Sequence, residues 1–331
     1  MVGYCRPLVW GLLFCFAGSL AGCTAIQTQT LREQQAVRSV STPQTGLPDA
    51  VELIQTPFFP QTEFHCGPAA LATVMVAQGV SVTPDDLGKA VYLPSRQGSL
   101  QTEMLAAARR FGRVPTRLPG RIEALFTEVA EGQPVVVFLN LGLSIAPAWH
   151  YAVLVGYDLA AGTVMLRSGP LEREIMSMRT FEHTWVRAGS WAFVVQEPGR
   201  WPLTAEEKTV LEASIGFERT GKPDQAVKVY QSALARWPRN LTLQMGLANS
   251  LYATGQKNAA ANAYQAVALL HDSLPAWINL IHTLLDLGDL SGAAKAMVQA
   301  EAVHSASWMS QLEAVQARLR ARQLESVGGA Q

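Results

Sequence analysis

Cys66 is the first residue of "CGPAALATVMVAQG", a run that predicts a helix closed by Gly79. Pro68 follows shortly after it, and proline is favoured in the first turn of a helix. The thiol is therefore expected at the positive end of a helix dipole, where its pKa falls and the nucleophilic thiolate forms more easily. The pattern favours a catalytic cysteine over the plainer interpretation, a buried and inert thiol.

His150 is the best-placed general base among the six histidines of the chain. It opens the apolar run "HYAVLVGY" directly after a loop, where a strand edge can present a base. His65 precedes Cys66, so its side chain should point elsewhere, and His183 has no obvious partner. Gln61 can donate to an oxyanion together with the backbone N–H of Cys66. Glutamine, cysteine and a distant histidine on a strand form a papain-like set.

The side chain that orients His150 is sought on the neighbouring strands. The loop "DLAAG" predicts a hairpin in which Tyr157 pairs with Thr163. In that register Ser168 is a diagonal neighbour of His150 on the same face, within reach of its ring. Asn140 ends the preceding strand and is a second candidate for this role.

These side chains must be positioned by a domain in which helices come first and strands follow. Helix-forming runs occupy residues 66–79, 99–112 and 121–132, and Ser99 and Gly112 are the expected N-cap and stop of the second run. Strand-forming runs follow at residues 134–141, 150–157, 163–168 and 190–196. This order predicts an α+β domain with an antiparallel sheet over residues 51–197.

After Pro198 the strand signals stop and the sequence repeats itself. Similar segments begin at Gly221, Gly255 and Gly288, with spacings of 34 and 33 residues. Other side chains recur in one register, namely Ala226, Ala260 and Ala293, and Tyr230, Tyr264 and Met297. The pattern resembles the tetratricopeptide repeat, a helix–turn–helix unit of 34 residues. We expect such repeats over residues 203–323, ending in a capping helix; a plain helical bundle is the alternative.

The N-terminal residues predict a lipoprotein signal. Arg6 precedes "PLVWGLLFCFAGSLAGC", whose apolar stretch of about 15 residues is short for a membrane span. The segment "LAGC" resembles the lipobox of bacterial lipoproteins, in which the signal is removed and the cysteine carries lipid. We expect a signal peptide at residues 1–22, lipidation at Cys23 and a flexible tether over residues 23–50. Thr24 favours the outer membrane, facing the periplasm; an ordinary signal peptide is the alternative.

Composition limits the other classes of function. The 331 residues include 26 Lys+Arg and 26 Asp+Glu, so the charge gives no reason to expect a nucleic-acid partner. Cys5 and Cys15 would leave with the signal and Cys23 would be acylated, which leaves Cys66 as the one free thiol. A lone thiol in an oxidising compartment needs a reason to be kept. The sequence has no CxxC and no HExxH motif, so neither a metal nor a cofactor is expected.

Residues of about 51–197 resemble the double-glycine leader peptidases, papain-like domains that process bacteriocin precursors at the front of certain ABC transporters. The resemblance rests on "QTEFHCGPAALATVM", "HYAVLVGYD" and a strand that ends in "LRSG". It implies Cys66 as nucleophile, His150 as base, Gln61 as oxyanion residue, and substrates with small residues such as Gly-Gly before the cut. Transporter-linked members carry an acid near the position of Ser168, and a serine offers no charge to an imidazolium. The ATP-binding motif GxxxxGK[ST] is absent, so the transport function does not carry over.

The sequence thus predicts an α+β papain-like cysteine peptidase domain followed by an all-α repeat solenoid. The expected protein is anchored to a membrane by lipid and cleaves a peptide or protein substrate, while its repeats recruit a substrate or a protein partner. Its expected catalytic residues are Cys66, His150, Gln61 and Ser168. Two alternatives stay open: a peptide-binding adaptor without catalysis, and a cysteine amidase or acyltransferase.

Overall fold

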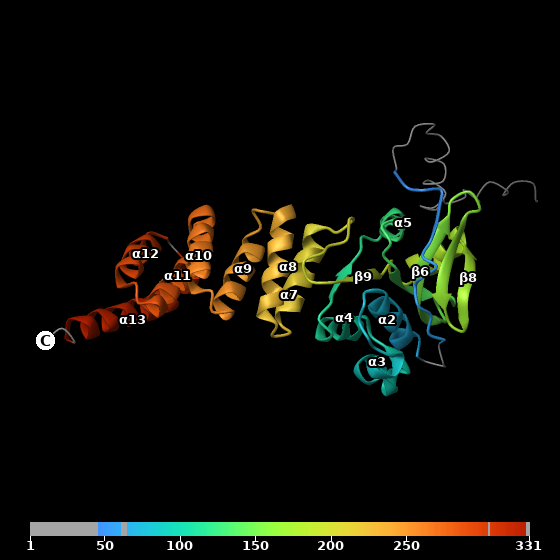
Figure 1. Ribbon diagram of the computed structural model, residues 1–331, viewed down its shortest axis with the longest axis horizontal. Helices are drawn as coiled ribbons and strands as arrows, with labels where there is room; N and C mark the ends of the chain where they lie inside the picture. Colours follow the sequence, from blue (N-terminus) through green and yellow to red (C-terminus); the bar gives the residue numbers. More distant parts are fainter. Residues whose placement is uncertain (1–45, 61–64, 304, 329–331) are drawn as a thin grey trace, which may run out of the picture.

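The structure is a computed structural model that describes residues 46–60, 65–303 and 305–328 of the chain. Figure 1 shows a sheet flanked by helices, and a row of helices that extends from it toward the C-terminus. The sheet-containing part ends with β9 (Ala192–Gln196), and the helical row begins with α7 (Glu207–Glu218). The predicted succession of an α+β part and an all-α part is confirmed.

A seven-stranded antiparallel sheet forms the centre of the first part. Six strands follow the order β4-β9-β5-β6-β7-β8, and β1 pairs with the C-terminal end of β6. The bounds of the strands are β1 (Ala50–Glu52), β4 (Val114–Arg117), β5 (Val135–Asn140), β6 (Trp149–Asp158), β7 (Thr163–Ser168) and β8 (Leu171–Ser177). A second, two-stranded sheet consists of β2 (Tyr92–Leu93) and β3 (Gly98–Ser99).

Helices cover both faces of the large sheet, so its central strands are apolar on both sides. One face, called the α2 face here, carries α2 (Cys66–Ala77), α3 (Pro84–Val91) and α4 (Gln101–Arg110). The opposite one, called the α6 face, carries α5 (Ile122–Ala130) and α6 (Met178–Arg187). Along β6 the side chains alternate: Tyr151 and Val153 pack on the α2 face, whereas Ala152 and Leu154 pack on the α6 face.

Most of the predicted elements of this domain are present, and the misses have local causes. Helices α2, α4 and α5 and strands β5, β7 and β9 lie within the predicted runs, and β6 extends one residue beyond its run at each end. The prediction of Ser99 as an N-cap is wrong: Ser99 pairs with Tyr92 in the small sheet, and Leu100 takes the N-cap position. Strand β8 is not predicted, because the side chains of β8 are mostly exposed and do not alternate between apolar and polar.

The hairpin between β6 and β7 departs from the predicted register at its turn. The pair Asp158–Thr163 closes the turn, so the prediction is wrong there by one residue. A bulge in β6 just before Gly156 absorbs the difference. Beyond the bulge the predicted register is restored, and Ser168 lies diagonally to His150 as expected.

The helical row follows the predicted repeat. Its further helices are α8 (Pro223–Arg236), α9 (Leu241–Ala253), α10 (Lys257–His271), α11 (Leu274–Leu287), α12 (Leu290–Ala302) and α13 (Met309–Gly328). Gly221, Gly255 and Gly288 each end the first helix of a pair, with φ of 70°, 77° and 78°. Only glycine adopts this left-handed conformation without strain, which explains its recurrence. The recurring alanines are buried, so neighbouring helices approach closely there.

The helical row is joined to the sheet domain by packing as well as by the chain. Val114 of β4 is buried in a cluster whose other members all belong to the helical part. Glu128 of α5 accepts hydrogen bonds from the backbone N–H and the hydroxyl of Thr204, at 2.8 and 2.7 Å. Removal of the helices would therefore expose Val114 and leave the buried carboxylate of Glu128 without these donors.

Candidate active site

Cys66 lies at the first residue of α2, as the helix signal predicts. Gly67 follows it where α2 approaches β3 closely: a Cβ on Gly67 would lie 2.4 Å from Ser99 Oγ. The carbonyl oxygen of Ser99 in turn accepts a hydrogen bond from the hydroxyl of Tyr151, at 3.1 Å. These contacts fix the N-terminus of α2 against β6, the strand that carries His150.

The thiol of Cys66 is half-buried, and this burial raises its pKa. Hydrogen bonds from the backbone amides of Tyr151, Gly67 and Cys66 oppose the rise in pKa. Tyr151 directly follows His150, so the sulfur reaches the β6 backbone beside the predicted base. The amides at the start of α2 are also donors that could receive an oxyanion.

The imidazole of His150 contacts Ser168: Nε2 lies 2.9 Å from Ser168 Oγ. With the proton on Nε2, the ring donates to the hydroxyl, and Nδ1 keeps the lone pair that a general base needs. Burial lowers the pKa of His150, and the negative charge of Glu174 on β8 opposes that shift. The structure thus has the contact expected of an orienting residue, while the catalytic role of Ser168 stays a prediction.

Cys66 and His150 belong to different faces of the sheet. Cys66 packs with the α2 face, whereas His150 shares its face with Leu139 and Ala152, which pack on the α6 face. Within the described ranges, no hydrogen bond joins Sγ of Cys66 to the His150 ring. Burial raises the pKa of the thiol and lowers the pKa of the imidazole, so burial favours the uncharged form of each group over an ion pair.

Asn140, the second candidate for orienting His150, has another role. Its Oδ1 accepts hydrogen bonds from the backbone N–H groups of Gly142 and Ala148, both at 3.0 Å. It pairs with Trp149 across β5 and β6, so its side chain lies on the opposite face from that of His150. Asn140 therefore holds the loop that leads to His150 and does not reach its ring.

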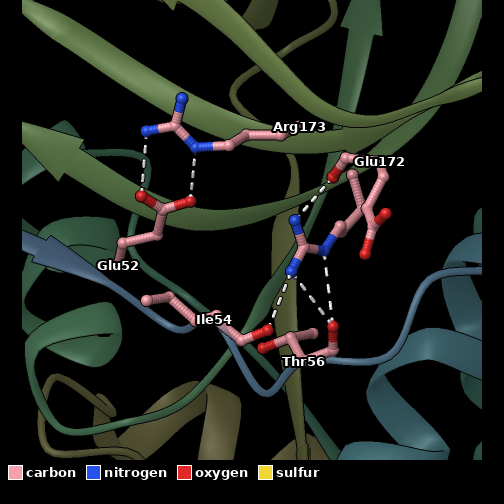
Figure 2. A network of polar contacts seen from close by, with 6 residues as sticks. Glu52, Ile54, Thr56, Glu172 and Arg173 are labelled. Atoms are coloured by element: carbon pink, nitrogen blue, oxygen red, sulfur yellow. Dashed lines mark hydrogen bonds and ion pairs between the residues drawn. The ribbon is translucent and has the colours of Figure 1, made fainter.

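Two arginines anchor the chain segment that leads from β1 toward Cys66. The buried guanidinium of Arg167 on β7 donates to three backbone carbonyls, those of Ile54, Thr56 and Glu172 (Figure 2). On β8, Arg173 forms a bidentate ion pair with Glu52, at 2.7 and 2.9 Å (Figure 2). Arg167 immediately precedes Ser168, so one strand both holds this segment and carries the partner of His150.

Two predicted site residues, Gln61 and Cys23, lie outside the described residues. The oxyanion role of Gln61 and the lipidation of Cys23 therefore stay predictions. Neither a metal-binding group of three or more His, Cys, Asp or Glu side chains nor a helix long and apolar enough to cross a membrane occurs in the described part of the chain.

His65 points away from the base, as expected for a neighbour of the nucleophile. Its ring stacks on that of Tyr92, with centroids 4.9 Å apart. The stacked pair borders an open pocket of about 760 Å³. The lining residues are His65, Asp85, Gly88, Lys89, Tyr92 and Pro94. His65, which lines the pocket, adjoins Cys66 in the chain.

Sequence reasoning misses Glu174, the charged side chain whose field acts on His150. The prediction includes no strand at β8, so nothing in it brings residue 174 near residue 150. A signal was present in the alternation of charges in "LEREI", which is typical of an edge strand with a solvated side.

Comparisons with known proteins match the two parts of the chain separately. The Peptidase_C39 like family matches residues 53–193, and the tetratricopeptide repeat matches residues 211–275. No curated protein sequence matches the chain.

Solved structures resemble each part at low identity. A candidate C39-like peptidase from Bacillus anthracis is 20% identical with a TM-score of 0.38, covering 45% of this chain and 98% of its own. The peptidase domain of Streptococcus ComA, a bifunctional ABC transporter, is 20% identical with a TM-score of 0.37, covering 43% and 99%. The Yersinia enterocolitica type III secretion translocator chaperone SycD is 20% identical with a TM-score of 0.34, covering 36% and 84%. Residues 53–193 are thus similar to the Peptidase_C39 like family, and residues 211–275 are similar to the tetratricopeptide repeat.

Proposed function

We propose that the first domain is a cysteine peptidase that cleaves a peptide or protein substrate, with Cys66 as nucleophile and His150 as base. The position of the thiol carries the proposal. Cys66 opens α2, and its sulfur accepts a hydrogen bond from the amide of Tyr151, the residue after His150. The match of this domain to the Peptidase_C39 like family supports the same class of reaction.

Because burial favours the uncharged thiol and the uncharged imidazole, the proton of the thiol must move during attack. Substrate binding brings the ring of His150 to the sulfur, and Nδ1 takes the proton as Sγ bonds to the carbonyl carbon. The backbone amides at the start of α2, with Gln61 as a further donor, receive the oxyanion. The C–N bond then breaks, the amine leaves with the proton returned by His150, and water hydrolyses the thioester.

A non-catalytic adaptor is the second candidate, and one observation favours it. Burial favours the uncharged thiol and the uncharged imidazole, and no hydrogen bond joins the two groups in the described ranges. A domain of this fold that only binds a peptide would have no need of an ion pair. Its peptide would occupy the same edge of the sheet without being cut.

The repeats are proposed to recruit a substrate or a protein partner. A pocket of about 300 Å³ among their helices is lined by side chains that can donate or accept hydrogen bonds. These are Tyr252, Tyr264, Asn279, His282, Thr283 and Arg318. Hydroxyl, amide and guanidinium groups of this kind suit the backbone and the polar side chains of an extended peptide.

We propose that a lipid on Cys23 anchors the protein in the outer membrane, facing the periplasm. The motif "LAGC" supports this location. Cys23→Ser should then release the protein from the membrane fraction without unfolding it. Lipid labelling that persists in this variant would refute the anchor.

Peptide cleavage is tested with the purified protein and a library of peptides from a bacterial proteome, with new N-termini identified by mass spectrometry. Wild type should release products, and Cys66→Ala and His150→Ala should release none. His183→Ala is the matched control, because His183 is an exposed histidine of α6 and its loss should change nothing. Intact peptides that stay bound would favour the adaptor, and products from cell-wall peptides alone would favour an amidase.

A further inference from the structure

A hydroxyl is the group in contact with Nε2 of His150. Ser168 can orient the ring but cannot stabilise the positive charge that the ring gains when it accepts a proton. We propose that Glu174 of β8 supplies this negative charge and acts on His150 through Ser168, as a positioning residue of the site. The inference rests on the proposed function, because it concerns the base of that reaction.

The strand register places the three side chains on one face of the sheet. Leu154 pairs with Leu166, and Leu166 pairs with Glu174, so one row crosses β6, β7 and β8. His150 and Ser168 lie an even number of residues from this row, so both share its face. Glu174 pairs with Leu166, two residues before Ser168, so Glu174 and Ser168 are diagonal neighbours, for which Cα atoms lie about 7–8 Å apart. A register shift between Leu166 and Ser168 pairs Ser168 with Leu171 instead of Glu172. A glutamate can span that distance directly or through one water molecule.

Ser168 can connect the two groups because a hydroxyl accepts and donates at the same time. When Nε2 of His150 carries the proton, the Ser168 oxygen accepts from the ring at 2.9 Å, and the hydroxyl hydrogen can then be donated toward the carboxylate of Glu174. The negative charge of Glu174 also acts in the expected direction, because it opposes the burial that lowers the pKa of His150. The position of Ser168 and the direction in which Glu174 shifts the pKa of His150 therefore support the same role for Glu174.

The neighbouring charges leave Glu174 available for this role. Arg173 lies on the opposite face and is paired with Glu52, and the guanidinium of Arg167 donates to backbone carbonyls. In the described part of the chain, no ion pair engages Glu174. The other ionisable groups on α2, α6 and β8 are Cys66 on α2, Arg179, Glu182, His183 and Arg187 on α6, and Glu172 on β8. The test variants below leave Cys66, Glu182 and Arg187 unchanged.

The test measures the pKa of His150 by NMR in the full chain, with the resonance assigned by its loss in His150→Gln. Glu174→Gln should lower this pKa. The alkylation rate of Cys66 at pH 6 should fall with it by about 3- to 10-fold, the range for a unit charge roughly 8 Å away in a partly solvated site. Glu172→Gln removes the same charge from the same strand and is the matched control, which should change neither quantity.

Three further variants separate a charge effect from a structural one. Glu174→Asp keeps the charge and should restore the pKa of His150 toward the wild-type value. In Ser168→Asp a carboxylate contacts the ring directly, so adding Glu174→Gln should then have little effect. The proposal is overturned if Glu174→Gln and Glu172→Gln lower the pKa equally, if Glu174→Asp fails to restore it, or if no shift occurs.

The titration requires no turnover, so its failure is distinct from failure of the peptidase proposal. A pKa shift specific to Glu174 without any peptide cleavage would support the role of Glu174 in setting the charge of His150 and refute the enzyme. Cleavage without such a shift would support the enzyme and refute the role of Glu174.

Discussion

Substitution of Gly67 by alanine should disturb the site through one close contact. The added Cβ would lie 2.4 Å from Ser99 Oγ and 2.6 Å from Ser99 Cβ. Ser99 cannot move away easily, because it pairs with Tyr92 in the small sheet and accepts the hydrogen bond of Tyr151. The clash therefore has to be relieved by a shift of α2, which carries Cys66.

The expected change in the free energy of unfolding follows from comparison with Gly88, a second helical glycine. Alanine is favoured over glycine in a helix by about 1 kcal/mol. At Gly88 of α3 an added Cβ would meet no atom within 4 Å, so Gly88→Ala should show this gain. At Gly67 the added Cβ would overpack the contact with Ser99, which costs about 1–3 kcal/mol and opposes the gain in helix propensity. We therefore expect Gly67→Ala to unfold with a free energy about 1–3 kcal/mol below that of Gly88→Ala.

The assay is urea unfolding followed by tryptophan fluorescence, to which the buried Trp185 and Trp191 of the first domain contribute. Ser99→Gly removes both clashing atoms, so the double variant Gly67→Ala/Ser99→Gly should recover the lost stability. Alkylation of Cys66 should be altered in Gly67→Ala and recover in the double variant. Equal stability of Gly67→Ala and Gly88→Ala would refute the close approach of α2 and β3.

Three other predictions address the base, its environment and the domain junction. Ser168→Ala should lower peptidase activity, and Ser168→Asp should keep or raise it, as measured by product assays. Asn140→Ala should leave the pKa of His150 unchanged in an NMR titration. Burial lowers the pKa of His150 in the folded state. As the pH falls, the unfolded state therefore takes up this proton at a higher pH than the folded state does. The free energy of unfolding should then decrease as the pH drops through about 6.5 toward the folded-state pKa. Thermal unfolding of His150→Gln should lose that part of the pH dependence, and an unchanged profile would contradict the burial of the ring. Deletion from Pro202 onward should leave the sheet domain folded but less thermostable, because Val114 loses its cluster and Glu128 loses its donors; circular dichroism measures both, and aggregation would mean that the two parts form one core.

The elements that carry Cys66 and His150 could be predicted because their signals are local. The proline after Cys66 and the glycine at residue 79 mark the ends of α2, and continuous apolar residues mark β6 as a strand covered on both sides. The recurring glycines and alanines of the repeats are local signals of the same kind. Each is determined by helix ends and helix contacts within one unit.

What the sequence could not predict depends on pairing between distant segments. The bulge before Gly156 shifts the turn but not the contact of His150 with Ser168. A glycine inside the strand suggests a bulge but does not fix its position or the pairing beyond it. Glu174 reaches the site only because β8 pairs with β7, and β8 is an exposed edge strand without an apolar pattern. The missing hydrogen bond between the thiol and the ring likewise follows from the packing of α2 and β6 on different faces.

The central claim is that Cys66 attacks a peptide carbonyl with His150 as its base. Acid quenching of the protein during incubation with the peptide library, followed by mass spectrometry of the fragment that contains Cys66, tests this claim directly. The account predicts a peptide acyl group joined to Cys66 through a thioester in the wild type, and none in His150→Ala. An unmodified Cys66 fragment beside intact, bound peptide in the wild type would contradict the account and establish the domain as a binding module.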